Sequence, residues 1–342
     1  MSSPTKSPVA LTDLPPLTRR YFFLGALSLA STGAFRSADA TAGQFREGSL
    51  IRRPAVSITD VTYYGAPLDN FIHRIFDEHR LDCKDKNVVI KPNLVEFSNG
   101  APINTHPALV KAVFEEVLAR GAAKVAIAEG PGHRRATLDL ADAAGYFDLM
   151  PRFERHFVDL NLDEVSQTVI PRPQSKLAHI YLPKIILGCD LLISLAKMKT
   201  HHWVGATLSM KNLFGIVPGS VYGWPKNVLH WAGLPECIVD LQSVVPNQFA
   251  IVDGIIAMAG NGPILGTPKP AGVVVAGRSP VAVDTVCCRL MGINPERVSY
   301  LRLARRLDRL SATPIEIGES LKTRISPFAL PSGMDDLRSP GL

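Results

Sequence analysis

The chain of 342 residues is 46% hydrophobic and 20% charged, with a mean hydropathy of +0.12. This composition supplies a core, which excludes an intrinsically disordered protein, and it is too polar for a membrane protein with many spans. The 37 Lys and Arg outnumber the 31 Asp and Glu, giving a net charge of +6. No nucleic-acid partner is expected, because the basic helix face over residues 302–309 carries no interleaved aromatic side chains.

An export signal is predicted over residues 1–40. A polar segment ends in Arg19 and Arg20, an uncharged run follows over residues 21–35, and a small-x-small sequence ends at Ala40. This order resembles a twin-arginine signal, which predicts recognition by the export machinery through Arg19 and Arg20 and cleavage near Ala40. The expected location of the mature protein is therefore the periplasm or another extracytoplasmic space. An ordinary amphipathic first helix with a chance arginine pair is the alternative.

The uncharged run over residues 21–35 is short for a membrane span. As a helix it would extend roughly 22 Å, whereas the hydrocarbon core of a bilayer is about 30 Å thick. No permanent membrane anchor is expected.

After a linker over residues 41–54, apolar runs and amphipathic segments alternate. A short β-type run at residues 87–90 precedes a helical pattern at 106–120 and a second β-type run at 124–128. This order predicts a β-α-β unit with a right-handed crossover and parallel strands. Further strands are predicted within residues 185–195, 248–256 and 271–276, and further helices at residues 137–144, 146–153, 281–291 and 298–310.

The predicted fold is therefore α/β, with a mostly parallel sheet, helices on both faces and a single large domain with insertions over residues 55–323. An irregular tail is expected over residues 324–342. The chain has five cysteines without any C-x-x-C spacing, so neither a disulfide framework nor a zinc site is indicated. Cys287 and Cys288 fall in a helical pattern and are expected to be buried free thiols.

Polar residues follow the predicted strands, where an open α/β sheet binds its ligands. Each has a plain structural alternative, such as a helix cap or a local ion pair, and the clustering at four strand ends favours a site. The candidates for ligand binding are Lys91, Asn93, Lys197, Lys211, Asn212, Asn261 and Asp284, and those for catalysis are Glu129, Lys199, His201 and Asp253.

The lysines predict the kind of ligand. Lys197 and Lys199 directly follow an apolar strand, where burial is expected, and a buried lysine is costly without an anionic partner. A small carboxylate or phosphate ligand would satisfy Lys91, Lys199 and Lys211 together, and Glu129 and Asp253 could do so without any ligand. In the leading hypothesis Lys199 and Lys211 neutralise the ligand, His201 transfers protons near pH 7, and the two carboxylates orient His201 or share a metal.

No metal or cofactor is identified by these motifs. Adjacent residues such as His201 and His202 point in different directions on a helix or strand, so they rarely hold one ion. The glycines over residues 260–266 have the wrong spacing for a dinucleotide loop, and prolines follow where a helix should begin. A tight turn that lines a pocket is the better interpretation.

Four ordered blocks resemble the family called domain of unknown function 362, over roughly residues 85–300. These blocks are residues 88–94, residues 197–201 with 210–215, residues 253–254 with 260–263, and residues 281–284 before 291–292. The resemblance implies an α/β domain. Some members carry a ferredoxin module, which this sequence lacks. Relatives commonly have Glu where this chain has Ala259, so the resemblance implies that any role of that carboxylate is lost or has moved to Glu129 or Asp253.

Three classes of function follow from these observations. The leading hypothesis is an exported protein that binds a small anion in a pocket lined by Lys, His and Asp and acts on it. The second is a non-catalytic periplasmic binding or scaffolding protein, which Ala259 and the absence of a nucleophile motif favour. The third is a metal or redox accessory protein without an iron–sulfur module.

Overall fold

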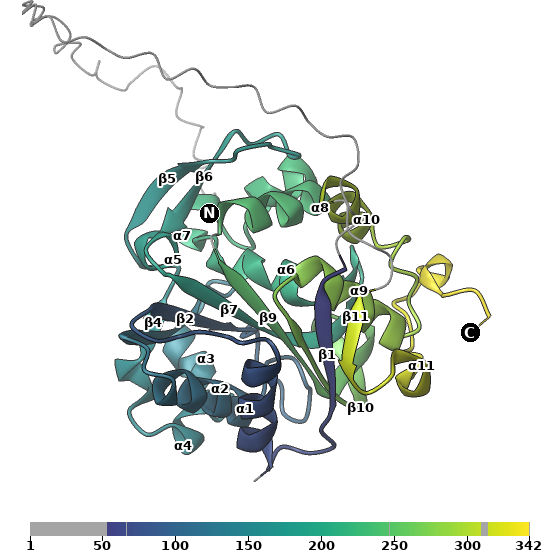
Figure 1. The fold of residues 1–342 in the computed structure, drawn as a ribbon. Coiled ribbons are helices and arrows are strands. Elements are labelled where there is room, and N and C mark those ends of the chain that lie inside the picture. Colours follow the sequence, from purple (N-terminus) through teal and green to yellow (C-terminus); the bar gives the residue numbers. More distant parts are fainter. Residues whose placement is uncertain (1–52, 66, 246, 309–313, 342) are drawn as a thin grey trace, which may run out of the picture. The chain divides into compact units, whose positions relative to one another are not determined.

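The buried apolar runs of the sequence form the strands of a central sheet (Figure 1). The computed structural model describes residues 53–65, 67–245, 247–308 and 314–341. The predicted export signal lies outside the described residues. The strands are β1 (Ala55–Asp60), β2 (Asn87–Pro92), β3 (Lys124–Glu129), β4 (Phe157–Asp159), β5 (Val165–Val169), β6 (His179–Pro183), β7 (Leu191–His201), β8 (Gly205–Thr207), β9 (Gln248–Asn261), β10 (Leu265–Gly277) and β11 (Ile315–Gly318).

Most strand pairs in this sheet are parallel. Its order is β11-β1-β10-β9-β7-β2-β3-β4, with β8 paired to β7, and β5 and β6 form a separate two-stranded sheet. The strands from β9 through β7, β2 and β3 to β4 pair in parallel, whereas β10 is antiparallel to both β9 and β1. The predicted α/β class and mostly parallel sheet are confirmed.

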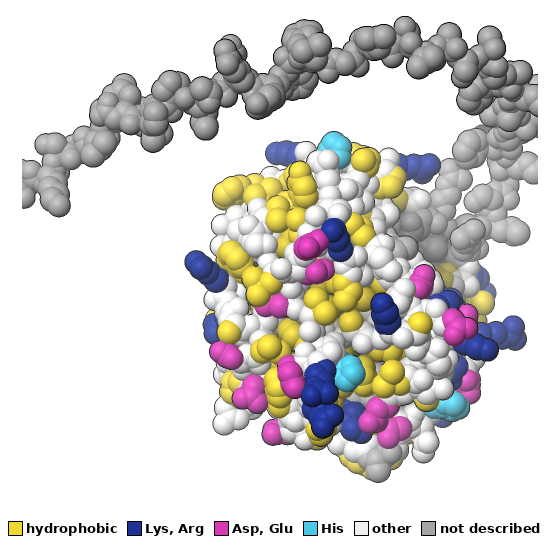
Figure 2. All heavy atoms as spheres, turned by 90° about the vertical axis from the view of Figure 1, so that its left-hand side faces the viewer, with side chains coloured by type: hydrophobic (Ala, Val, Ile, Leu, Met, Phe, Trp, Pro, Cys, Tyr) yellow, Lys and Arg dark blue, Asp and Glu magenta, His cyan; other side chains and the backbone are white. Residues whose placement is uncertain are grey.

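Helices cover both faces of the sheet, and on the face of the molecule seen in Figure 2 charged side chains of both signs are scattered among hydrophobic ones. They are α1 (Leu68–Glu78), α2 (Pro107–Ala119), α3 (Thr137–Ala143), α4 (Tyr146–Leu149), α5 (Lys184–Leu187), α6 (Ser209–Asn212), α7 (Gly219–Tyr222), α8 (Asn227–Val244), α9 (Pro280–Leu290), α10 (Ser299–Asp308) and α11 (Leu321–Arg324), with 3-10 turns η1 (Phe153–Arg155), η2 (Leu213–Ile216) and η3 (Asp335–Leu337). Figure 1 shows α1 to α4 grouped together and α8 to α10 in a second group.

The central strand β7 joins the two halves of the core. Its side chains alternate, so Leu191 and Ile193 pack with α1 and α2, while Leu192 and Ala196 pack with α8 and α9. All eleven residues of β7 are buried. Because both of its faces are covered, β7 forms the centre of the domain and carries Lys197, Lys199 and His201 into the interior.

Three features differ from or extend the sequence prediction. The run over residues 271–276 belongs to a long hairpin with β9 and is antiparallel, although the alternating pattern favoured parallel strands. Helix α8 was not foreseen, because Gly233 and Pro235 interrupt its pattern and Gly233 has the non-helical φ of 115°. The tail contains short helical turns and packs on the domain through the buried side chains of Phe328 and Leu337.

The cysteines agree with the expectation from their spacing. Cys83, Cys189, Cys237, Cys287 and Cys288 are all free and buried. Burial raises the pKa of each of the Cys287 and Cys288 thiols well above its usual value, so both are uncharged at neutral pH.

Candidate functional site

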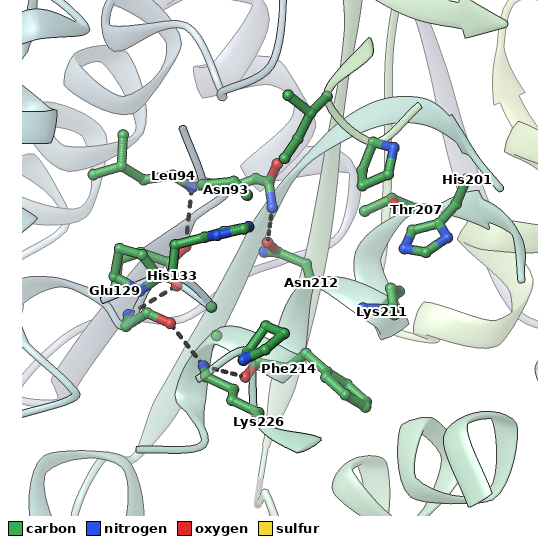
Figure 3. A pocket seen from close by; sticks show the side chains of 18 of the residues that line it. Asn93, Leu94, Glu129, His133, His201, Thr207, Lys211, Asn212, Phe214 and Lys226 are labelled. Carbon is green, nitrogen blue, oxygen red and sulfur yellow. Dashed lines mark hydrogen bonds between the residues drawn. The ribbon is translucent and has the colours of Figure 1, made fainter. Parts of the chain in front are cut away.

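A cavity of about 150 Å³ lies beyond the carboxyl ends of β2 and β3 and beside the end of β7. Its wall includes Lys91, Asn93, Glu129, Lys199, His201, Thr207, Lys211, Asn212, Phe214, Lys226 and His230 (Figure 3). Pro263 and Ile264, from the turn between β9 and β10, close one side. A volume of this size holds several water molecules or one small organic ion.

Two buried lysines have carboxylate partners. Lys91 Nζ lies 2.6 Å from Oε2 of Glu129, and Lys197 Nζ lies 2.9 Å from Oδ2 of Asp253. Glu129 also accepts from the backbone N–H groups of Leu94 and Gly130. The carboxylate of Glu129 is therefore fully occupied as a counterion, as the structural alternative in the sequence analysis allows.

The carboxylate of Asp253 is occupied in the same way. The hydroxyl of Tyr64 and the backbone N–H of His106 donate to it, and the rings of Tyr64 and His106 stack with centroids 3.7 Å apart. Lys197 also donates to the Tyr64 hydroxyl at 2.9 Å. Lys197 and Asp253 thus belong to a cluster beside the cavity and do not line it.

Three further lysines have no carboxylate within 4 Å in the part of the chain that the structure describes. Lys199 donates to the carbonyl oxygens of Ile103 and Pro263, and Lys226 to those of Gly130 and Phe214. Lys211 Nζ lies 4.1 Å from the centroid of the Phe214 ring. The ring is the only partner found for this ammonium among the described residues.

The surroundings of these lysines disfavour their charged forms. Burial lowers the pKa of Lys226 to about 7, and burial together with the charge of Lys91 lowers that of Lys211 to about 8. Burial lowers the pKa of Lys199 well below its usual value, and the charges of Lys197 and Lys211 lower it further. A negative charge in the cavity would reverse these shifts, since it favours the ammonium forms.

Two imidazoles at the cavity are in different tautomers. Nδ1 of His201 accepts from the backbone N–H of Trp203 at 3.1 Å, so the neutral ring carries its proton on Nε2. Nδ1 of His230 lies 3.1 Å from the carbonyl oxygen of Lys226, which only accepts, so this ring has a free lone pair on Nε2. Burial, followed by the charge of Lys211, lowers the pKa of His201 well below its usual value.

The proton on Nε2 changes the role predicted for His201. Its Nε2–H is a hydrogen-bond donor at neutral pH, and its Nδ1 lone pair is already used by Trp203. His201 therefore acts as a neutral donor toward the cavity, not as the proton-accepting group expected from its ordinary pKa.

Two buried polar atoms of the wall lack any hydrogen-bond partner among the described residues. They are Oδ1 of Asn93 and Oγ1 of Thr207. The amide group of Asn93 donates to Oδ1 of Asn212, and the amide of Asn212 donates to the carbonyl of Lys91 and the hydroxyl of Ser194. These contacts fix which atom of Asn93 is the oxygen. Unpaired polar atoms are rare inside proteins, so both atoms are available as hydrogen-bonding groups at the cavity.

The cavity brings together seven of the residues predicted from sequence: Lys91, Asn93, Glu129, Lys199, His201, Lys211 and Asn212. Lys197 and Asp253 form the neighbouring cluster, so their predicted place in the ligand site is corrected. Two other predicted ligand residues also lie elsewhere. Asp284 is fully buried and accepts from Ser209 and Met210 at the start of α6, while Asn261 is exposed and accepts from the backbone of Ser332.

The polar residues of the wall that sequence reasoning missed include Thr207, Lys226 and His230. Thr207 belongs to the three-residue strand β8, and the other two lie in or beside α8. None follows a recognisable strand. The only signal was the presence of Lys and His near a Trp-Pro sequence at Trp224, which does not indicate burial.

We find no metal site among the residues that the structure describes. No group of three or more His, Cys, Asp or Glu side chains there is arranged to hold an ion. The rings of His201 and His202 stack with centroids 5.2 Å apart, and Nδ1 of His202 bonds to the carbonyl oxygen of Gly262. Ala259 is buried on β9 and does not line the cavity.

None of the helices among the described residues has the length and apolar character needed to cross a membrane.

The chain is similar to several known proteins. It is 28% identical over 236 residues to the thylakoid-associated protein sll1697 of Synechocystis, covering 67% of this chain and 70% of that protein. Among solved structures, the lactate racemase apoprotein of Thermoanaerobacterium thermosaccharolyticum aligns with 70% of this chain at 14% identity and a TM-score of 0.43. A protein of Thermotoga maritima aligns with 70% at 10% identity and a TM-score of 0.33.

This chain spans 57% and 58% of the lengths of those two solved chains. The family model described as "Domain of unknown function (DUF362)" matches residues 88–289, which contain most of the sheet and the whole cavity wall. The chain therefore belongs to the DUF362 family.

Proposed function

We propose that the protein binds a small anion in the cavity between β2, β3 and α6. The observation that carries this proposal is the set of three lysines, Lys199, Lys211 and Lys226, at one cavity without a carboxylate partner within 4 Å among the described residues. A carboxylate or phosphate group would supply the missing negative charge. The unpaired Asn93 Oδ1 and Thr207 Oγ1 support a bound molecule that makes hydrogen bonds as well.

The lysines contribute in different ways. Lys199 and Lys226 are almost completely buried and already donate to carbonyl oxygens, so they act mainly through the positive potential they create. Lys211 is only partly buried and has no such acceptor. Direct contact with the anion is therefore assigned to Lys211, with the Nε2–H of His201 as a second donor.

Calorimetric titration of the full chain with phosphate, sulfate, acetate and glycolate tests the proposal. Binding of at least one of these anions is expected, and Lys211→Met is expected to weaken it by at least about tenfold, the loss of one charge-assisted contact. Lys184→Met is the matched control, because Lys184 is exposed, pairs with Glu164 and does not line the cavity. Equal affinity in both variants would rule out the assigned contact.

The alternative of non-catalytic binding is tested in the same samples. Glu129 and Asp253 are held by lysines, which argues against either carboxylate as a base. Each anion that binds is incubated with the protein and followed by nuclear magnetic resonance for conversion or hydrogen exchange. If the ligand binds and does not change, the result supports a non-catalytic binding protein. If the ligand is converted or exchanges hydrogen, the result supports an enzyme.

We also propose that residues 1–40 direct export through Arg19 and Arg20. The support comes from the sequence alone, with paired arginines, an uncharged run and a small-x-small site in order. Replacing both arginines by lysine should leave the precursor in the cytoplasm of the native host. Arg36→Lys, in the same segment but outside the pair, is the control and should not change fractionation. Unchanged export of the double variant would contradict the signal.

A further inference from the structure

We propose that Lys211 is a nucleophile that forms an imine with the carbonyl group of a small anionic carbonyl compound. The inference rests on the proposed anion cavity and adds covalent chemistry and a substrate class to it. A 2-oxo carboxylate and an aldehyde phosphate are two such compounds, because each has a reactive carbonyl carbon close to an anionic group.

The first argument is that the amine of Lys211 is free to react. Five lysines lie in or beside the cavity, and the ammonium groups of four are held. Lys91 and Lys197 pair with carboxylates, while Lys199 and Lys226 donate to carbonyl oxygens. Lys211 has neither kind of acceptor among the described residues, and its nitrogen lies over the Phe214 ring.

The second argument concerns the protonation of that amine. A lysine attacks a carbonyl only as the neutral amine, and a desolvated site beside another cation produces that form near neutral pH. Burial and the neighbouring charge of Lys91 lower the pKa of Lys211 to about 8. A substantial share of Lys211 is therefore neutral at physiological pH, unlike an exposed lysine.

The third argument is the placement of a hydrogen-bond donor and a base beside Lys211. His230 and Lys211 both contact the ring of Phe214, with a distance of 5.9 Å between the His230 and Phe214 ring centroids. His201 lies on the same side of the cavity, near Lys211 in Figure 3, and the Lys211 charge influences its pKa. His230 offers an Nε2 lone pair, and His201 offers an Nε2–H.

These groups account for each atom of the reaction. The Nζ lone pair of Lys211 forms a bond to the carbonyl carbon while the C–O π bond breaks. His230 accepts a proton from the amine and delivers it to the carbonyl oxygen, while His201 stabilises that oxygen through a hydrogen bond and keeps its own proton, which gives a carbinolamine. His230 then takes the second amine proton and delivers it to the hydroxyl group, which leaves as water and leaves the C=N bond. No oxidant or reductant takes part.

The charged group of the substrate has a separate place in the cavity. Lys199 and Lys226 line the same cavity and attract the charged group, so the Lys211 amine can be neutral and still meet an anionic substrate. An uncharged aldehyde lacks this attraction. The site should therefore prefer anionic carbonyl compounds to neutral ones of the same size.

Borohydride trapping tests the proposal directly. The full chain is incubated with pyruvate, glyoxylate or glyceraldehyde 3-phosphate, reduced, digested and mapped by mass spectrometry. The expected result is one reduced adduct per chain at Lys211, at least about tenfold above that at any exposed lysine. Acetaldehyde is the uncharged comparison and should label Lys211 less than the anionic compounds do.

Two variants complete the experiment. Lys211→Arg keeps the positive charge and should abolish the adduct, and Lys184→Arg should leave it unchanged. If Lys211→Arg does not fold, the pH profile of trapping in the wild-type protein shows whether the labelled amine is Lys211 or a surface lysine. The profile is measured as the initial rate at a carbonyl concentration well below saturation, which reports the free protein. Its midpoint should lie near pH 8 if the nucleophile is Lys211, and near 10.4 if the label is on ordinary surface lysines.

The outcomes separate this inference from the anion cavity itself. Binding of glycolate or phosphate by calorimetry, without any adduct at Lys211 from all three anionic carbonyl compounds, would overturn the imine and leave the proposed function standing. Equal trapping of acetaldehyde at Lys211, with no anion binding, would overturn the proposed function and the substrate class. Labelling spread over exposed lysines would overturn the nucleophile.

Discussion

Lys197 and Lys199 lie two residues apart on β7, and only Lys197 has a carboxylate partner among the described residues. Asp253 on β9 pairs in register with Lys197, and the register then shifts so that Lys199 lies opposite Met258. The shift leaves the Lys199 ammonium on carbonyl oxygens, one of them from Ile103. One irregularity in the sheet thus separates a lysine with its own counterion from a lysine that lines the cavity without one among the described residues.

Replacing Lys211 by methionine is expected to stabilise the ligand-free protein by about 1–2 kcal/mol, a magnitude typical of removing a desolvated charge next to like charges. The pKa of Lys211 is about 8 in the folded protein, against about 10.4 in an unfolded chain, so folding disfavours its charge at pH 7. Urea denaturation at pH 7 measures the change. The gain should disappear in the presence of a bound anion, and a loss of stability would contradict the assignment.

Replacing Glu129 by glutamine is expected to destabilise the protein by about 3–5 kcal/mol, because it leaves the buried Lys91 without a counterion. Glu164→Gln is the control. It removes an exposed pair with Lys184, for which a loss of no more than about 1 kcal/mol is expected. Similar losses in the two variants would mean that the Lys91–Glu129 pair is not essential to the core.

Affinity for sulfate, which does not titrate in this range, is expected to fall as the pH rises from about 6 to about 9. In the free protein the pKa values of Lys226 and Lys211 are about 7 and about 8, and a bound anion raises both. Below pH 7 both lysines are mostly charged before the anion binds, so the affinity is highest there. Above pH 7 the lysines of the free protein are increasingly neutral and must take up protons when the anion binds, which lowers the affinity.

Calorimetry in buffers of different ionisation enthalpy measures this proton uptake. It should be largest near pH 8 and smaller in Lys211→Met. A dissociation constant independent of pH, with no proton uptake, would show that the anion neither contacts these lysines nor changes their protonation.

Gly215 is expected to tolerate no side chain. A Cβ atom at this position would collide with Oε1 of Glu129 and with the end of the Lys91 side chain. Gly215→Ala should therefore cost about 1–3 kcal/mol through overpacking and disturb the ion pair beside the cavity. Gly132→Ala is the matched control from the same wall, since its Cβ would meet no atom within 4 Å. Chemical denaturation of both variants should separate them, and equal stability would contradict the close packing.

Much of the fold and part of the site followed from the order of residues. The pattern around residues 87–128 predicted the parallel unit, because strand and helix repeats are local properties of the chain. The same pattern placed Lys91 and Glu129 at neighbouring strand ends, and they form an ion pair. It did not anticipate α8, where Gly233 and Pro235 interrupt the helical repeat and tertiary packing maintains the element.

The predicted site contained two kinds of residue that sequence could not separate. Asp284 and Lys211 were both predicted to bind the ligand, yet Asp284 accepts from the backbone at the start of α6 and Lys211 lines the cavity. Its burial raises the pKa of Asp284 to about 7. Which role a polar side chain takes depends on what lies opposite it, and that partner comes from a distant segment.

The sequence by itself determined the α/β class, the parallel core, the free cysteines and the cluster of basic residues at the strand ends, because these follow from local periodicity and chain order. Only the tertiary structure decided the balance of charge. It paired Lys91 and Lys197 with carboxylates, brought Lys226 from α8's flank to the same cavity as Lys199, and left Lys211 without an acceptor among the described residues. Ion pairing depends on distances of a few ångströms between segments far apart in the chain, and strand periodicity carries no information about those distances.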